Sequence, residues 1–168
     1  MTGNESAEDR LVDVDRLDTV RFLLVAAERE GKRMRAASLR HVGLTPAQSE
    51  VLEVVRQRGP LTLAELGRLV VSETGSPSRL VDTLVQRGFL NREPTPGDKR
   101  AVMLSLTSAG QATVEKAVEV CAVRDYIAHR LTSDEADDLV RLLAKLVADT
   151  PGGCAVASRF PAVRVLHG

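Results

Sequence analysis

Apolar residues recur with the spacing of an α-helix over several long segments of the chain. Between residues 11 and 39, Leu17, Val20, Leu24 and Ala27 are separated by charged and polar residues. This spacing places the four side chains on one face of a helix. The pattern therefore predicts one long amphipathic helix in the first quarter of the chain.

Further helices are predicted from capping sequences. Thr45, Thr62 and Thr132 each stand three positions before a Gln or Glu, the spacing of a capping box, and Thr107 is expected to cap another helix. The helix after Thr45 is expected to end at Gly59-Pro60, because glycine commonly follows a helix end and proline cannot continue one. The two C-terminal helices are expected to cover residues 107–130 and 132–149.

The middle of the chain changes from helical to strand periodicity. A helix is predicted over residues 74–87. Beyond it, residues 102–106 alternate between apolar and other side chains, after a Pro- and Gly-containing turn at residues 92–100. Alternation around such a turn favours a β-hairpin. The predicted fold class is mostly α with a small β-wing.

The tail after Pro151 is sparsely apolar, and the sequence does not define its structure. Two interpretations are open for this tail. It either extends a dimer interface, which we favour, or is disordered, as chain ends often are.

The charge is balanced overall but unevenly distributed. The 168 residues include 23 Lys+Arg and 23 Asp+Glu, and a net charge of zero argues at first against a nucleic-acid partner. Residues 1–18 hold six acids and two bases, however, whereas residues 56–101 hold eight bases and five acids, a net charge of +3. The total therefore predicts weak nonspecific affinity for DNA and does not exclude specific binding.

Several classes of protein are excluded by missing sequence features. Aromatic residues are only 2% of the chain, so we do not expect stacking on single-stranded bases. No Walker, GxGxxG, GxSxG, HExxH or CxxC motif occurs, and we predict no enzyme, no cofactor and no metal site. The acidic N-terminus and the short apolar runs predict no signal peptide, no membrane partner and a cytoplasmic location.

The start of the helix predicted over residues 74–87 carries residue types suited to DNA. Small hydroxyl side chains let a helix N-terminus approach a duplex, and an arginine can bind guanine through two hydrogen bonds. Lys99 and Arg100 at the hairpin tip could reach a narrow minor groove. Each feature alone also fits a plain helix cap or a solvated turn, but their succession within about 50 residues favours DNA binding. The polar residues at the helix start are Thr74, Ser76, Ser78 and Arg79.

Residues 44–110 resemble the winged helix-turn-helix domain of the MarR (multiple antibiotic resistance regulator) family. The flanking helices match that family only in layout. The resemblance implies that residues 74–87 form a recognition helix, and that the first helix and the last two pack against a second subunit in a homodimer. The stretches that carry it are Leu61–Leu66, Ser78–Leu84, Arg87–Arg92, Asp98–Arg100 and Leu106–Gly110.

The resemblance also implies which residues contact DNA. Lys99 and Arg100 would lie on the wing near the minor groove. Thr62 would cap the helix that lies across the DNA backbone and could contact a phosphate. The residues nearest the major groove would be Thr74, Ser76, Pro77, Ser78 and Arg79, of which Pro77 replaces a commonly apolar residue.

Two further residues are expected to support the wing. Asp98 would hold the wing arginine by a salt bridge instead of touching DNA, and Arg92 would help to fix the wing. The thiol-sensing branch of the family uses a cysteine near the N-terminus. This chain has no cysteine there, which argues against peroxide sensing by that route.

We predict a homodimeric transcriptional regulator that represses by binding a pseudo-palindromic duplex operator. Residues 44–107 would form its DNA-binding domain, and residues 11–40 and 107–168 its dimerisation region. The helices predicted over residues 11–39, 107–130 and 132–149 each have an apolar stripe. The winged domain is too small to cover all three stripes, which supports a dimer. A small effector is expected to modulate binding, but no residue pattern identifies it.

Two alternatives remain open at this stage. The first is a winged-helix dimer that contacts another protein instead of DNA, because one fold hosts many functions. The second is a thiol- or metal-dependent sensor that uses Cys154 and His167 of the C-terminal tail.

Overall fold

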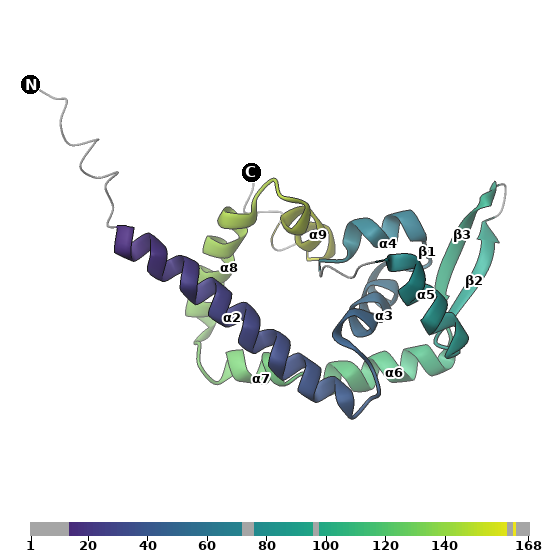
Figure 1. Ribbon diagram of the computed structural model, residues 1–168, viewed down its shortest axis with the longest axis horizontal. Coiled ribbons are helices and arrows are strands. Elements are labelled where there is room, and N and C mark those ends of the chain that lie inside the picture. The colour runs from purple at the N-terminus through teal and green to yellow at the C-terminus, as the bar shows by residue number, and fades with distance from the viewer. Residues whose placement is uncertain (1–13, 72–75, 96–97, 161–162, 164–168) are drawn as a thin grey trace, which may run out of the picture.

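The computed structural model describes residues 14–71, 76–95, 98–160 and 163, and the side chains of residues 95–101 lie outside that description. A winged unit, formed by residues 46–106, occupies one side of the molecule (Figure 1). A set of outer helices, formed by residues 14–40, 122–128 and 133–147, occupies the other side. None of the helices in the described ranges is long and apolar enough to cross a membrane.

The winged unit contains three of the predicted helices. These are α3 (Pro46–Arg58), α4 (Leu63–Leu69) and α5 (Pro77–Gln86). The capping boxes at Thr45 and Thr62 are both formed, and α3 ends at Gly59, which confirms these predictions. Because the caps satisfy backbone N–H groups at the helix starts, these boundaries could be located from the sequence.

Helix α5 starts close to the position expected, three residues after the first residue of the predicted range 74–87. Ser76 is its N-cap and has extended backbone angles (φ −102°, ψ 109°), so the helix begins at Pro77 and not at residue 74. The residue before a proline is sterically disfavoured in the helical region, which explains the later start.

The wing belongs to a three-stranded antiparallel sheet. Strands β2 (Leu90–Thr95) and β3 (Asp98–Leu106) form the predicted hairpin, and Leu90 lies opposite Leu106. A third strand, β1 (Leu61–Thr62), pairs with the other edge of β3. The prediction of only two strands is therefore wrong, because a strand of two residues carries no periodicity and is defined only by its partner.

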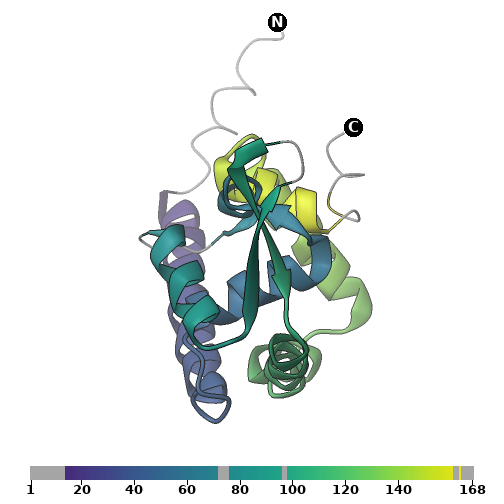
Figure 2. The same ribbon diagram turned by 90° about the vertical axis from the view of Figure 1, so that its right-hand side faces the viewer.

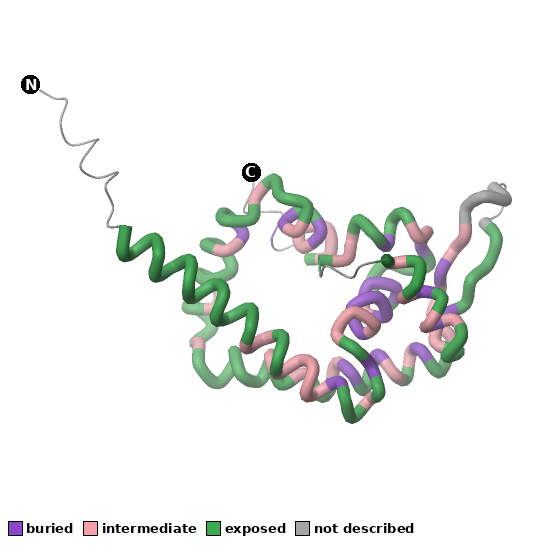
Figure 3. Tube along the Cα trace, viewed as in Figure 1, coloured by how far each residue is buried: buried purple, intermediate pink, exposed green. Residues whose placement is uncertain are grey.

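The core of the winged unit joins all of its elements. Leu52, Leu66, Leu84 and Leu104, from α3, α4, α5 and β3, are fully buried. Val114 adds the helix that follows the sheet to the same cluster. Buried residues concentrate in this part of the chain, as Figure 3 shows, and the core therefore fixes the orientation of α5 against the sheet.

A short connection links the wing to helix α6 (Ser108–Glu119). Thr107 caps α6, as predicted, and its hydroxyl also donates to the carbonyl of Gly88 at 2.6 Å. A β-carbon at Gly110 would collide with the carbonyl oxygen of Phe89. Glycine at this position therefore allows α6 to pack closely against the base of the wing.

The outer helices differ from the prediction at one point. Helix α2 (Val14–Arg40) is continuous, as expected, but the helix predicted over residues 107–130 is divided into α6 and α7 (Ala122–Ala128). Val120 and Cys121 leave the helical conformation, and the break allows α7 to pack against α2. Cys121 is consequently the half-buried N-cap of α7.

The C-terminal part contains one expected and one unexpected helix. Helix α8 (Ser133–Val147) starts at the predicted capping box of Thr132. Helix α9 (Pro151–Arg159) lies in the tail for which the sequence defined no structure, and it contains Gly152 and Gly153. The Thr150 hydroxyl caps α9 by accepting from Gly153 N at 3.1 Å. In Figure 1, α9 lies between α8 and α4.

Candidate nucleic-acid interface

Helix α5 and the wing lie side by side on one face of the molecule (Figure 2). Ser78 and Arg79 are exposed, whereas Val81 and Leu84 on the opposite side of the helix are buried. Ser76 is exposed and makes no capping hydrogen bond with its side chain. The apolar side therefore anchors α5 in the core and leaves polar groups at its N-terminus facing solvent.

An ion pair connects α5 to the wing. Arg92 Nη1 on β2 donates to Asp82 Oδ1 on α5 at 2.8 Å, and both side chains are about half exposed. Arg92 was expected to support the wing, but Asp82 had no predicted role. No regular spacing pairs a helix residue with a strand residue ten positions later, so the sequence alone offered no signal for this contact.

A second group of contacts holds the C-terminal end of α5. The Arg87 guanidinium donates to Gln48 Oε1 at 3.3 Å and lies over the Phe89 ring, 4.7 Å from its centroid. Gln48 belongs to the capping box of α3 and also accepts from Thr45 N at 3.0 Å. Arg87 therefore ties the start of α3 to the end of α5 and the start of β2.

Thr62 is engaged in capping α4. Its backbone N–H and its hydroxyl donate to Glu65 Oε2 at 2.7 and 2.8 Å, and its hydroxyl accepts from Glu65 N at 3.2 Å. These hydrogen bonds from Thr62, together with the nearby charge of Arg68, lower the pKa of Glu65. A contact between Thr62 and a DNA phosphate stays a prediction.

The remaining predicted contacts fall on residues that the structure does not describe in full. Thr74 lies outside the described residues. The backbone of Asp98, Lys99 and Arg100 opens strand β3, but their side chains lie outside the description. The salt bridge expected for Asp98 and the DNA contacts expected for Lys99 and Arg100 therefore stay predictions.

The alternative sensor site has no support in the described part of the chain. Cys154 lies exposed on α9, and His167 lies outside the described residues. The described residues contain no group of three or more His, Cys, Asp or Glu side chains that could hold a metal.

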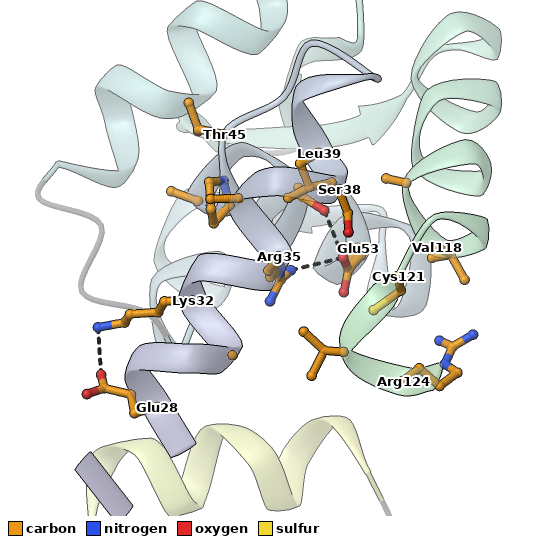
Figure 4. Close-up of a pocket in the computed structure, with 17 residues that line it drawn as sticks. Glu28, Lys32, Arg35, Ser38, Leu39, Thr45, Glu53, Val118, Cys121 and Arg124 are labelled. Carbon is orange, nitrogen blue, oxygen red and sulfur yellow. Dashed lines mark hydrogen bonds and ion pairs between the residues drawn. The ribbon is translucent and has the colours of Figure 1, made fainter. Parts of the chain in front are cut away.

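A pocket of about 640 Å³ lies where α2, α3, α6 and α7 meet. Its lining combines apolar side chains, among them Leu39 and Val118, with the charged side chains of Arg35 and Glu53 (Figure 4). Arg35 Nη2 donates to Glu53 Oε1 at 3.0 Å. Pockets of this volume with a few polar groups are typical of small-molecule sites.

The order of elements in residues 46–106 defines a class of protein. Three helices are followed by a twisted hairpin, and the third helix lies beside that hairpin and has exposed polar residues at its N-terminus. This arrangement is a winged helix-turn-helix.

Comparison with known proteins identifies the family. Residues 44–102 match the model described as the MarR family. The chain is 36% identical over 104 residues to the uncharacterized HTH-type transcriptional regulator YkoM of Bacillus subtilis (strain 168), covering 61% of this chain and 68% of YkoM. It is 33% identical over 106 residues to the multiple antibiotic resistance protein MarR of Escherichia coli (strain K12), covering 62% and 74%. The chain belongs to the MarR family of winged-helix transcriptional regulators.

Solved structures of similar proteins agree with this assignment. A mutant of MarR from E. coli, complexed with operator DNA, superposes with a TM-score of 0.70 at 28% identity, covering 79% of this chain and 96% of that one. The transcriptional repressor CouR, bound to a 23-mer DNA duplex, superposes with a TM-score of 0.71 at 25% identity, covering 80% and 96%. The fold predicted from the sequence, mostly α with a small wing, is confirmed.

Proposed function

We propose that this protein binds a pseudo-palindromic duplex operator as a homodimer and represses transcription by occupying it. The observation that carries the proposal is the Arg92–Asp82 ion pair, which holds the polar start of α5 and the wing on one face. The similarity to MarR complexed with operator DNA and to CouR bound to a DNA duplex supports it. A protein acting on DNA in this way would work in the cytoplasm.

The N-terminus of α5 would enter the major groove. Its first-turn N–H groups and positive end favour phosphate oxygens, and Ser78 and Arg79 are exposed and close enough in sequence to reach neighbouring base edges. Lys99 and Arg100 on the wing would contact the adjacent minor groove. Phosphate contacts would position the protein, and the α5 side chains would read the sequence.

A second copy of the chain would cover the exposed apolar side chains of the outer helices. Residues 14–29 of α2 are exposed on every side of the helix (Figure 3). A helix with this much exposed apolar surface needs a packing partner to be stable in water. These helices carry large apolar side chains that are 38–70% exposed. They are Val14, Leu17, Val20, Phe22, Leu23, Leu24 and Val25 of α2, Tyr126 and Ile127 of α7, and Leu139, Val140, Leu142, Leu146 and Val147 of α8.

A two-fold dimer determines the form of the operator. Two α5 helices related by a two-fold axis would contact half-sites about one DNA turn, or roughly 34 Å, apart. The operator would then be an inverted repeat. The domain division predicted from the sequence, with residues 44–107 on DNA and the flanking segments at the dimer interface, fits this arrangement.

The pocket between α2, α3, α6 and α7 is the proposed effector site. It lies between the winged unit and the helices that would form the dimer, so a bound molecule would contact both. An effector changes DNA affinity only if it binds one spacing of the two α5 helices more tightly than another. The mixed apolar and charged lining suits a small molecule that carries a polar group.

Selection of bound duplexes from random and genomic DNA tests the proposal. We expect recovery of an inverted repeat whose half-sites are about one helical turn apart. Recovery of no enriched sequence, while the protein remains folded and dimeric, would contradict it and favour a winged-helix dimer that contacts another protein.

A further inference from the structure

A buried arginine connects the C-terminal helix α9 to the winged unit. Arg159 Nη1 contacts Glu50 Oε1 of α3 at 3.1 Å, and the two side chains are only 7% and 3% exposed. Arg159 Nη2 lies 3.8 Å from Glu53 Oε2, and Arg159 Nε donates to Gln57 Oε1 at 3.2 Å. The guanidinium of α9 is therefore inserted among three side chains of α3.

Glu50 has a second partner close to the recognition helix. The same Oε1 atom accepts a hydrogen bond from the backbone N–H of Val71 at 2.8 Å. Val71 follows Val70, the C-cap of α4, and stands five positions before Ser76, the N-cap of α5. Glu50 thus holds the chain where it leaves α4 on the way to α5.

The buried carboxylate of Glu50 depends on a compensating cation. An ionised carboxylate out of water is costly unless it is paired, and removing one partner of a buried pair leaves an uncompensated charge. Arg159 is the cation that α9 supplies to Glu50. Loss of Arg159 would therefore disturb the carboxylate that accepts from Val71 N.

We propose that Arg159 is a positioning residue for DNA recognition, acting through Glu50 on α3 and the end of α4, which both pack against α5. The proposal rests on the DNA-binding function proposed above. Helix α9 would then help to determine, through its packing against α3 and α4, how α5 is oriented toward DNA. A second connection runs through Glu53, which contacts both Arg159 and Arg35 at the pocket, so this connection adjoins the proposed effector site.

Three full-length variants test this coupling. Arg159→Met removes the cation, and Glu50→Gln removes the charge but keeps an oxygen that can accept from Val71 N. The double variant combines both changes. Arg141→Met is the matched control, because it breaks an exposed ion pair with Asp138 within α8. The measurements are hydrogen exchange of the Val71 amide by NMR without DNA, binding of a duplex recovered by selection, and thermal unfolding.

We expect Arg159→Met to accelerate Val71 exchange and to weaken duplex binding, each on the order of tenfold, at a temperature where the protein is fully folded. Adding Glu50→Gln is expected to restore both to within about threefold of wild type, because the double variant no longer contains the buried charge that Arg159 compensates. The control should change neither. A purely structural role for Arg159 would lower the unfolding temperature without this recovery.

Other outcomes decide against the proposal or support it by another route. Unchanged Val71 exchange in Arg159→Met, or a double variant no better than the single one, overturns it. If Arg159→Met does not fold, recovery of a folded protein on adding Glu50→Gln supports the coupling, and failure to recover overturns it. If no variant and no wild-type protein binds any duplex, the proposed function fails, whereas Val71 exchange still decides whether Arg159 acts through Glu50.

Discussion

Arg92 Nη1 lies 2.8 Å from Asp82 Oδ1, so one ion pair joins the wing to helix α5. Disruption of this pair by Arg92→Ala is expected to weaken operator binding about tenfold, because the wing and α5 would no longer be held together. The protein should lose less than about 1 kcal/mol of stability, since both side chains are half exposed. Electrophoretic mobility shift and urea unfolding measure the two effects.

Asp82→Asn distinguishes a positioning role from direct DNA contact by Arg92. If the pair acts as a unit, Asp82→Asn weakens binding as much as Arg92→Ala does, and the double variant is no worse than either. A loss seen only with Arg92→Ala would mean that Arg92 itself contacts DNA. Arg141→Ala, which breaks a comparable exposed pair on α8, serves as control.

Arg79 at the start of α5 is expected to carry base discrimination. Arg79→Ala should cost about 1–3 kcal/mol of operator binding and relax the preference at one position of each half-site. Binding to duplexes with single base changes measures this loss. Gln86→Ala, at the far end of the same helix, is the control. Equal loss for all duplexes would instead assign Arg79 to a phosphate.

Arg100 at the start of β3 is expected to contact the DNA backbone or the minor groove. If it meets a phosphate, Arg100→Ala should weaken binding and flatten the plot of log K against log salt by roughly one unit per subunit. Lys145→Ala on α8 removes one positive charge elsewhere and should leave the slope unchanged. An unaltered affinity in Arg100→Ala would remove the wing tip from the interface.

Leu142 on α8 is expected to lie in the dimer interface. It is 51% exposed in the single chain, so Leu142→Asp should leave the fold of each subunit intact while placing a charge in the interface. Sedimentation should show a dimer for the wild type and a monomer for the variant. Ala112→Asp, on the exposed side of α6, is the control. A monomeric wild-type protein at micromolar concentration would contradict the proposed architecture.

Acid should weaken the capping box of α4. Thr62 lowers the pKa of Glu65 in the folded chain, so ionised Glu65 stabilises the fold above its unfolded pKa. This contribution is lost as the pH falls from the pKa of an unfolded glutamate, about 4.3, through the lower pKa of folded Glu65. Glu65→Gln keeps an acceptor and cannot titrate, so its unfolding midpoint should lack this part of the acid dependence. An identical pH profile for wild type and variant would contradict the assignment.

Glu135 offers a matched comparison for this prediction. Hydrogen bonds from Thr132 lower its pKa by the same arrangement at the start of α8. Glu135→Gln should therefore also remove a part of the acid dependence, while leaving α4 and the DNA-facing surface unaltered.

Local signals in the sequence predicted much of this fold because they act within a few residues. The threonines at 45, 62, 107 and 132 each cap a helix by accepting a hydrogen bond from the backbone N–H three positions later, and the structure forms all four caps. The hairpin was predicted from the alternation of apolar and other side chains after the turn at residues 92–100. Such contacts depend little on the rest of the chain, which is why they could be recognised before the fold was known.

The features that were missed depend on contacts distant in sequence. Helix α9 was not predicted, because Gly152 and Gly153 are weak helix formers and its packing against α4, which is distant in sequence, exists only in the folded chain. The break at Cys121 follows from the packing of α7 on α2, and the apolar spacing runs through it. In the site, Asp82 was missed since only the folded sheet brings it to Arg92.

One residue, Thr107, separates the last residue of β3 from the first residue of α6. Its backbone N–H donates to Phe89 O at 3.1 Å and its hydroxyl donates to Gly88 O. Both hydrogen bonds hold this connection against the residues that precede β2. These two hydrogen bonds couple the base of the hairpin to the start of α6, so we expect the two elements to move together. A small rotation of α6 would then displace the far end of the hairpin more than its base, because the hairpin extends away from Thr107.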